Sequence, residues 1–252
     1  MNEPRLRNVQ CAHIGGLHRM AYREWGDPGN GRVLVCAHGL LRQGRDFDTL
    51  AQAMSVEYRV VCPDVVGRGE SDRLPDPSGY QIANYVADMV TLLARLDAAT
   101  VHWVGTSMGG IIGMGLASAK DTPISRLVLN DVGPTIDAEG IARIVAYVGA
   151  APTWKTEDEA ADYLLSISPG FGPHSREQWM ALTRPMLRRD GDVFRLHYDP
   201  AIAIALRAIT PAVAAAGQAA LWAAYDAIRC PTLVLHGADS DILAPATAQA
   251  MT

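Results

Sequence analysis

The sequence lacks several features that mark whole classes of protein. No stretch of its 252 residues approaches the ~18 consecutive apolar residues that a membrane-spanning helix needs. The first ten residues, MNEPRLRNVQ, contain no apolar segment of the kind found in secretory signal peptides. The net charge of −5 gives no reason to expect a nucleic acid or an anionic membrane as partner. We therefore expect a cytoplasmic protein that binds neither.

Cysteine is scarce, and its spacing does not match metal or redox motifs. The four cysteines are Cys11, Cys36, Cys62 and Cys230, and no two of them form a C-x-x-C pair. The nucleotide-binding pattern G-x-x-x-x-G-K-[ST] is also missing, although residues 63–72 form a polar loop punctuated by glycine. We expect no metal and no cofactor, and we interpret the cysteines as structural thiols.

Apolar residues, by contrast, are plentiful: 49% of the chain is hydrophobic and 19% is charged, which is typical of a globular protein with a substantial core. Short apolar runs predict strands at 8–13, 18–25, 32–37, 58–62, 101–104, 125–130 and 231–235. Helical patterns lie between several of them, at 46–54, 80–96 and directly after Ser107. This alternation predicts an α/β fold with a mostly parallel sheet flanked by helices.

The pattern changes between residues 135 and 229, where helices are expected at 139–148, 157–167, 176–188, 201–209 and 212–227. Two begin with capping boxes, Thr156-x-x-Glu159 and Ser175-x-x-Gln178. We therefore divide the chain into a core, 1–134 with 230–252, and a helical cap, 135–229. Trp154 and Trp179 of the cap are candidates for lining an apolar substrate pocket, although packing within the cap would also explain them.

The most informative segment is 101–115, VHWVGTSMGGIIGMG. Residues 105–109 fit G-x-S-x-G, in which a serine lies on a sharp turn from strand to helix. The glycines let strand and helix approach closely, and the turn strains the serine backbone. The new helix leaves unpaired N–H groups beside the Ser107 hydroxyl, suited to stabilising an oxyanion. A tight turn without chemistry would also use such residues, so the rest of the chain has to decide.

Two further strand ends carry candidate site residues. The strand at 32–37 ends in His38-Gly39-Leu40, which offers the N–H of Leu40 as an oxyanion donor. We expect His38 to fix this loop by hydrogen bonds, and His38 and Gly39 to border the substrate. A carboxylate that follows a strand end is where a catalytic histidine would be oriented. After the strand at 231–235, Asp241 is the first choice and Asp239 the second, and Asp131 after the preceding strand is a third candidate, although either Asp239 or Asp241 could instead cap the next helix.

Taken together, the chain resembles the α/β-hydrolase family, and within it the cap-bearing carboxylesterases and meta-cleavage-product hydrolases. The matching pieces, in the family's order, are residues 38–40, 64–71, 105–109 and the loop at Asp241. The resemblance implies that Ser107 is the nucleophile and that the N–H groups of Leu40 and Met108 form the oxyanion hole. It also implies that Asp241 orients a histidine.

That histidine is missing from residues 1–252. In the family it follows the acid after a further helix and strand, which together need about 17 residues, whereas only 11 residues follow Asp241 and none is histidine. Without a base, a serine hydroxyl is a weak nucleophile. We therefore expect the sequence to stop short of the protein's C-terminus.

The expected function is hydrolysis of carboxylic esters of small or medium apolar substrates, through an acyl-enzyme on Ser107. The serine argues against epoxide hydrolases and haloalkane dehalogenases of this fold, which use an aspartate at that position. Hydrolysis of C–C bonds, lactones or thioesters stays open. A hypothesis of another class is a non-catalytic ligand-binding relative that lacks the histidine.

Overall fold

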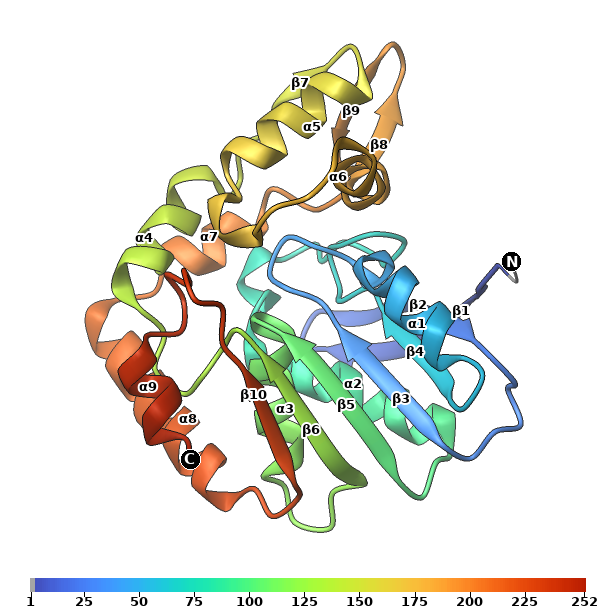
Figure 1. Ribbon diagram of the computed structural model, residues 1–252, viewed down its shortest axis with the longest axis vertical. Coiled ribbons are helices and arrows are strands. Elements are labelled where there is room, and N and C mark those ends of the chain that lie inside the picture. The colour runs from blue at the N-terminus through green and yellow to red at the C-terminus, as the bar shows by residue number, and fades with distance from the viewer. Residues whose placement is uncertain (1–2) are drawn as a thin grey trace.

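A seven-stranded sheet forms the centre of the molecule, with its strands in the order β1-β2-β4-β3-β5-β6-β10 (Figure 1). The computed structural model describes residues 3–252. The strands are β1 (Arg5–His13), β2 (Gly16–Trp25), β3 (Val33–Ala37), β4 (Arg59–Pro63), β5 (Val101–Thr106), β6 (Ile124–Asn130) and β10 (Thr232–Leu235). The β1–β2 and β2–β4 pairs are antiparallel, and all other pairs are parallel, which confirms the predicted fold class.

Helices cover both faces of the sheet, so its central strands are buried on both sides. Helix α1 (Asp48–Met54) lies on one face, whereas α2 (Ile82–Leu96) and α3 (Met108–Ala117) lie on the other (Figure 1). Successive side chains of a strand point to opposite faces. Val33 and Val35 of β3 accordingly join the main hydrophobic cluster, while Leu34 and Cys36 join a second cluster under α1.

The cap lies above the sheet and consists of helices with a small second sheet (Figure 1). Its helices are α4 (Ala138–Tyr147), α5 (Glu157–Ser166), α6 (Arg176–Thr183) and α7 (Ile202–Arg207), and its strands are β7 (Thr153–Trp154), β8 (Leu187–Asp190) and β9 (Val193–Leu196). The short 3₁₀ helices η3 (Pro169–Phe171) and η4 (Arg184–Met186) also lie in the cap, whereas η1 (Gly44–Phe47) and η2 (Pro77–Gly79) lie in the core. Both predicted capping boxes are present, at Thr156 and Ser175.

The small cap sheet was not expected from the sequence. The helix predicted over 176–188 ends at Thr183, because Pro185 cannot continue an α-helix and instead lies in the first turn of η4. A hairpin follows, in which β8 pairs with β9. Gly191 makes the turn between these strands with a φ of +59°, a conformation that glycine adopts readily.

Strand β10 lies at one edge of the sheet, and helices α8 and α9 precede and follow it in the sequence. Helix α8 (Pro211–Ala227), which the sequence analysis placed in the cap, packs against α3 of the core. Beyond β10, helix α9 (Pro245–Ala250) follows the loop that carries Asp241. Leu233 and Leu235 of β10 are 55% and 45% exposed. Among the helices of residues 3–252, none is both long enough and apolar enough to span a membrane.

Candidate active site

Ser107 lies on the turn that joins β5 to α3, as the G-x-S-x-G pattern predicts. Its φ of 50° and ψ of −117° form a backbone conformation that residues other than glycine rarely adopt. The turn is held in place because the Ser107 N–H donates to the carbonyl of Asn130 at 3.0 Å, and the Ser107 carbonyl accepts from Gly110 N–H at 2.8 Å. The strained residue is therefore fixed by both the neighbouring strand and the new helix.

The two glycines of the pattern are required by space. A Cβ at Gly105 would lie 2.3 Å from the carbonyl oxygen of Gly109, and a Cβ at Gly109 would lie 2.0 Å from the carbonyl oxygen of Ala37. Both contacts are with backbone atoms, which cannot move aside as a flexible side chain can. Strand β3, strand β5 and helix α3 therefore meet at a distance that only glycine permits.

Backbone donors are available beside Ser107. Met108 is the first residue of α3, so its N–H has no acceptor within the helix. Within the described residues 3–252, the N–H of Leu40 makes no hydrogen bond either. The loop that carries Leu40 lies close to the nucleophile, since a Cβ at Gly39 would be 3.7 Å from the Cβ of Ser107. The geometry is compatible with the two-donor oxyanion hole expected from the sequence.

His38 fixes this loop from beneath. One ring nitrogen, Nδ1, is 2.7 Å from the Gly39 carbonyl oxygen, and Nε2 accepts the N–H of Val65 at 2.9 Å. The side chain is fully buried, and burial lowers the pKa of His38 to about 3. His38 is therefore neutral with both nitrogens engaged, which fits the expected role of holding the loop and leaves no ring nitrogen for a substrate.

Arg68 is a buried support of the site that sequence reasoning missed. Its guanidinium donates to the carbonyls of Leu40 at 2.8 Å and Val66 at 2.7 Å, and to the Tyr85 hydroxyl at 3.0 Å. It also lies 3.7 Å from the sulfur of Met108. One side chain thus contacts both residues whose N–H groups are the candidate oxyanion donors. The signal in the sequence was an arginine within the glycine-punctuated loop 63–72, which does not reveal burial.

Asp241, the first choice for the acid, is held by the cap. Its carboxylate accepts two hydrogen bonds from Arg143 of α4, from Nε at 2.5 Å and from Nη2 at 2.8 Å. These hydrogen bonds lower the pKa of Asp241. Asp241 is therefore ionised at neutral pH, as an orienting carboxylate must be, but in this structure it orients an arginine.

The other two carboxylates lie at the same edge of the sheet. Asp131 follows β6, with a φ of 55°, and accepts from the Gly237 N–H at 3.2 Å and the Ser240 hydroxyl at 2.9 Å. It thereby fixes the loop that carries both Asp239 and Asp241. Asp239 itself is exposed. The choice of Asp241 over Asp239 stays a prediction.

The two tryptophans of the cap have different surroundings. Trp179 is buried in the cap's own hydrophobic cluster, and its Nε1 donates to the Ala161 carbonyl at 2.8 Å. Packing within the cap accounts for it fully. Trp154 is half-buried, with its ring 5.2 Å from that of Tyr163. The cap contacts the core at residues 38–42, the loop that carries the candidate donor Leu40 and is called the oxyanion loop below. Arg42 of this loop donates to the Leu182 carbonyl at 3.1 Å.

A general base is not in place among residues 3–252. The sequence has seven histidines, yet the Ser107 hydroxyl makes no hydrogen bond to any of them in the part of the chain that the structure describes. His236 follows β10, but its Nε2 lies 2.9 Å from the carbonyl oxygen of Leu243. Ser107, the two candidate N–H donors and a carboxylate are thus in place, whereas no histidine of residues 3–252 links Ser107 to the carboxylate.

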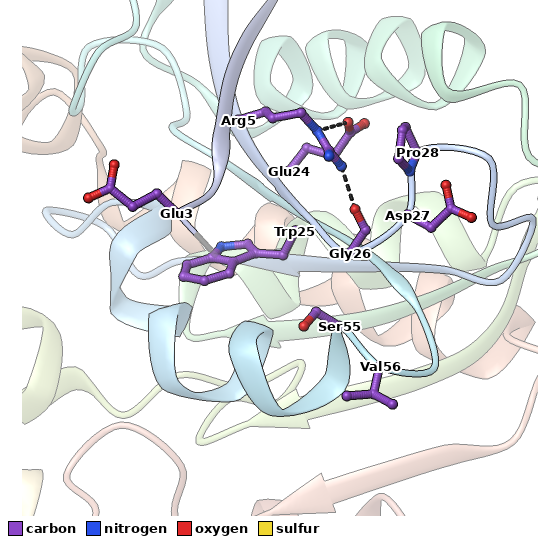
Figure 2. A pocket seen from close by; sticks show the side chains of 9 residues that line it. All are labelled: Glu3, Arg5, Glu24, Trp25, Gly26, Asp27, Pro28, Ser55 and Val56. Carbon is purple, nitrogen blue, oxygen red and sulfur yellow. Dashed lines mark hydrogen bonds and ion pairs between the residues drawn. The ribbon is translucent and has the colours of Figure 1, made fainter. Parts of the chain in front are cut away.

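Two surface hollows lie away from Ser107. The first, with a volume of about 550 Å³, is lined by residues of β1, β2 and the end of α1 (Figure 2). Arg5 extends across it to Glu24 at 3.1 Å. The second, of about 610 Å³, lies beside α2 and the end of α3. Neither is lined by a residue of the oxyanion loop or of the turn at residues 105–109, called the elbow below. Neither is therefore a candidate for the substrate site.

Comparison with known proteins agrees with this geometry. Residues 32–252 match the family model described as alpha/beta hydrolase fold. A 3-hydroxybutyrate-oligomer hydrolase from Cupriavidus necator is 54% identical over 95% of this chain and 83% of its own length. A 2-hydroxy-6-oxo-2,4-heptadienoate hydrolase from Pseudomonas putida is 27% identical over 61% of this chain and 65% of its own.

Solved structures give the same result. The structure of an alpha/beta hydrolase from Novosphingobium aromaticivorans superposes with a TM-score of 0.87 and 34% identity, over 100% of this chain and 87% of that one. Ser107 lies where epoxide hydrolases and haloalkane dehalogenases of this fold carry an aspartate. The argument against those two activities rests on the sequence alone. The sequence match, the parallel sheet and the elbow geometry lead to one conclusion: this chain is a hydrolase of the α/β-hydrolase fold family.

Proposed function

We propose that this protein is a carboxylic ester hydrolase that forms an acyl-enzyme on Ser107. The observation that carries the proposal is the strained backbone of Ser107, with its φ of 50°, beside the N–H groups of Met108 and Leu40, which find no acceptor within residues 3–252. Acyl transfer needs a nucleophile and pre-oriented donors for the oxyanion, within about 3 Å of the reacting carbon and oxygen. The elbow and the loop at residues 38–40 supply both.

The proposed substrate class is a short ester of a hydroxy acid. This part of the proposal rests on the relative from Cupriavidus necator, whose name gives 3-hydroxybutyrate oligomers as its substrate and which is 54% identical over nearly the whole chain. Such oligomers are joined by carboxylic ester bonds between one acid group and the next hydroxyl. A Ser107 acyl-enzyme would carry a hydroxyacyl group and release the remaining oligomer as an alcohol.

The mechanism follows from the same residues. The Ser107 Oγ attacks the ester carbonyl, and the resulting oxyanion accepts from the N–H groups of Met108 and Leu40. The C–O bond to the leaving alcohol then breaks, and water hydrolyses the acyl-enzyme to the free acid. Both steps need a base that takes a proton and returns it to the leaving group. We propose that a histidine oriented by Asp241 does this, with Arg143 giving up its contact to the carboxylate.

The test is hydrolysis of a 3-hydroxybutyrate dimer by the protein purified from its natural source, followed by titration of the released acid. We expect Ser107→Ala to lower kcat by at least about 10³-fold, because the acyl-enzyme cannot form. The matched control is Ser118→Ala, at the other end of α3, where the hydroxyl only donates to the Gly115 carbonyl. Unchanged turnover in Ser107→Ala would overturn the proposal.

Two other functions have a specific observation in their favour. The similarity to the Pseudomonas putida protein, whose name gives it as a hydrolase of 2-hydroxy-6-oxo-2,4-heptadienoate, favours hydrolysis of an unsaturated oxo acid, for which the same turn at Ser107 would serve. The lack of a base against Ser107 in residues 3–252 favours a binding protein without turnover. Saturable binding of the dimer without release of acid, in the protein from its source, would support the second.

A further inference from the structure

Three buried side chains with metal-binding atoms lie far from the elbow in the order of the sheet. Cys11 of β1 and His18 of β2 are direct partners across the hairpin, so their side chains share one face of the sheet. Helix α2 packs on this face and contributes Asp88. One ligand atom from each of the three residues lies within 4.8 Å of the other two. Elements distant in the sequence thus bring a thiol, an imidazole and a carboxylate together.

This cluster is enclosed and incompletely paired. Cys11, His18 and Asp88 are 1%, 4% and 1% exposed. His18 Nε2 lies 2.9 Å from Asp88 Oδ2, but the buried Nδ1 of the same ring has no hydrogen-bond partner within residues 3–252. An unpaired buried nitrogen is costly, and within residues 3–252 the Asp88 carboxylate has His18 as its partner but no arginine or lysine. A cation bound between the three side chains would take the free nitrogen as a ligand and balance the charge of the carboxylate.

We propose that Cys11, His18 and Asp88 bind one zinc-like divalent metal ion. Thiolate, imidazole and carboxylate form a mixed S, N and O donor set that zinc accepts in tetrahedral sites, with bond lengths of about 2.0–2.3 Å. Bond lengths of this size put neighbouring ligand atoms roughly 3.5 Å apart, so the three side chains need to move by about 1 Å. The 2+ charge of the ion would be balanced by the thiolate and the carboxylate.

Binding releases the thiol proton. Without metal, the Cys11 sulfur keeps its proton and donates it to the main-chain carbonyl oxygen of Asp88, at 3.9 Å. A bound divalent cation reverses this preference, because the thiolate becomes its ligand and the proton passes to solvent. His18 binds through the free Nδ1 or through Nε2 once that atom leaves Asp88. Affinity is therefore expected to fall as the pH is lowered.

The fourth position has a candidate nearby. His13 lies two residues after Cys11 on β1, and its ring centroid is 5.3 Å from that of His18. His13 Nδ1 accepts the N–H of Gly15 at 3.0 Å, so His13 would have to give up this bond or change its tautomer to bind. Water is the other occupant of this position. Either way, the ion would join the β1–β2 hairpin to α2 and serve the fold rather than the reaction at Ser107.

The experiment uses the 252-residue chain, stripped with a chelator and then dialysed against zinc chloride alone. We expect about one equivalent of zinc per chain and a higher thermal midpoint. Cobalt(II) in place of zinc should give a thiolate-to-cobalt charge-transfer band in the near ultraviolet. Cys11→Ala and Asp88→Asn are expected to weaken binding by roughly tenfold to a hundredfold or more, and to abolish the band in the first case. His13→Asn weakens binding only if His13 is the fourth ligand.

Matched controls remove other thiols and histidines. Cys36→Ala deletes an equally buried thiol of β3, and His174→Asn deletes an exposed imidazole of the cap, and both should bind like the unchanged chain. Substoichiometric zinc in the unchanged chain, or affinity within twofold of it in Cys11→Ala, would overturn the proposal. If Cys11→Ala does not fold, the cobalt band in Cys36→Ala, Cys62→Ala and Cys230→Ala decides: a band in all three supports Cys11 as the ligand, and loss of the band in any one of them overturns the proposal.

Discussion

The nucleophile side and the acid side of the site are built in different ways. Around Ser107 the backbone is enclosed so tightly that the Gly109 Cα faces the Ala37 carbonyl with no space for a methyl group. Around Asp241 the main chain is also tightly packed, since a Cβ at Gly140 would overlap the Asp241 carbonyl oxygen, but the Asp241 side chain is 42% exposed. The carboxylate is held there by a single ion pair across to the cap.

This difference separates two sources of geometric precision. At the elbow, steric exclusion leaves the backbone one conformation, and the position of the hydroxyl follows from it. At Asp241 the main chain is closely packed as well, but the carboxylate itself is held by hydrogen bonds from Arg143, 98 residues away in the sequence. The comparison leads to predictions that treat the two sides in pairs, from the largest expected effect to the smallest.

The largest contrast is expected between two glycine-to-alanine changes. Gly109→Ala puts a methyl group against backbone of β3 and should lower the free energy of unfolding by about 3 kcal/mol or more. Gly217→Ala, in α8, meets nothing within 4 Å and should raise it by about 0.5–1 kcal/mol, since alanine is the better helix former. Urea denaturation measures both. Similar losses in the two variants would contradict the comparison.

The second prediction concerns how the free energy of unfolding depends on pH. The buried His38 has a pKa of about 3, whereas in the unfolded chain its pKa is about 6.5. The unfolded state therefore binds the extra proton, and stability should fall by about 1.4 kcal/mol for each pH unit between these values as the pH is lowered. His38→Gln should remove this contribution to the slope. Urea denaturation at pH 7, 6 and 5 tests it, and an unchanged slope in the variant would contradict it.

The third contrast concerns two residues with positive φ. Ser107→Gly should relieve strain and raise the free energy of unfolding by about 1 kcal/mol. Asp131→Gly relieves strain as well but removes the hydrogen bonds to Gly237 and Ser240, so we expect a net loss of about 1 kcal/mol. Thermal and urea denaturation of the pair decide. A stabilised Asp131→Gly would show that those hydrogen bonds contribute little.

The smallest effect is expected for Arg143→Ala. Hydrogen bonds from Arg143 lower the pKa of Asp241, so the pair adds stability above the unfolded pKa of about 3.9 and loses it as the pH falls below that value. The Asp241 side chain is 42% exposed, and solvent screening limits the effect to less than about 1 kcal/mol. Urea denaturation at pH 7 and pH 3 should show a larger difference between the two proteins at pH 7.

Features with a local steric cause were predictable from the sequence. The turn at Ser107, the strands of the sheet and the two capping boxes each depend on residues that are close together in the chain. The strand-to-helix pattern around residues 105–109 allows few alternatives, because any side chain at Gly105 or Gly109 would clash with backbone. The prediction of the fold class followed from a series of such local patterns.

Features that depend on distant contacts were not predictable. Arg68 looks like a loop residue in the sequence, and only the packing of α2 and the oxyanion loop around it makes it buried. The partnership of Arg143 with Asp241 spans nearly a hundred residues. The hairpin of β8 and β9 was missed although Pro185 precedes it and Gly191 makes its turn, because the helical pattern before it was extended too far.

The cap's separate hydrophobic cluster makes part of this protein exchangeable. Residues of α5, α6 and η4 pack on one another, whereas Val148, Ile202 and Ala203 at the base of the cap belong to the main core. Evolution, or a protein engineer, could therefore replace the segment between β7 and β9 and leave the sheet and the turn at Ser107 unchanged, provided that its contacts with Arg42 and Gln43 are kept. The shape of the cap and the stability of the core would then be inherited from different parts of one gene.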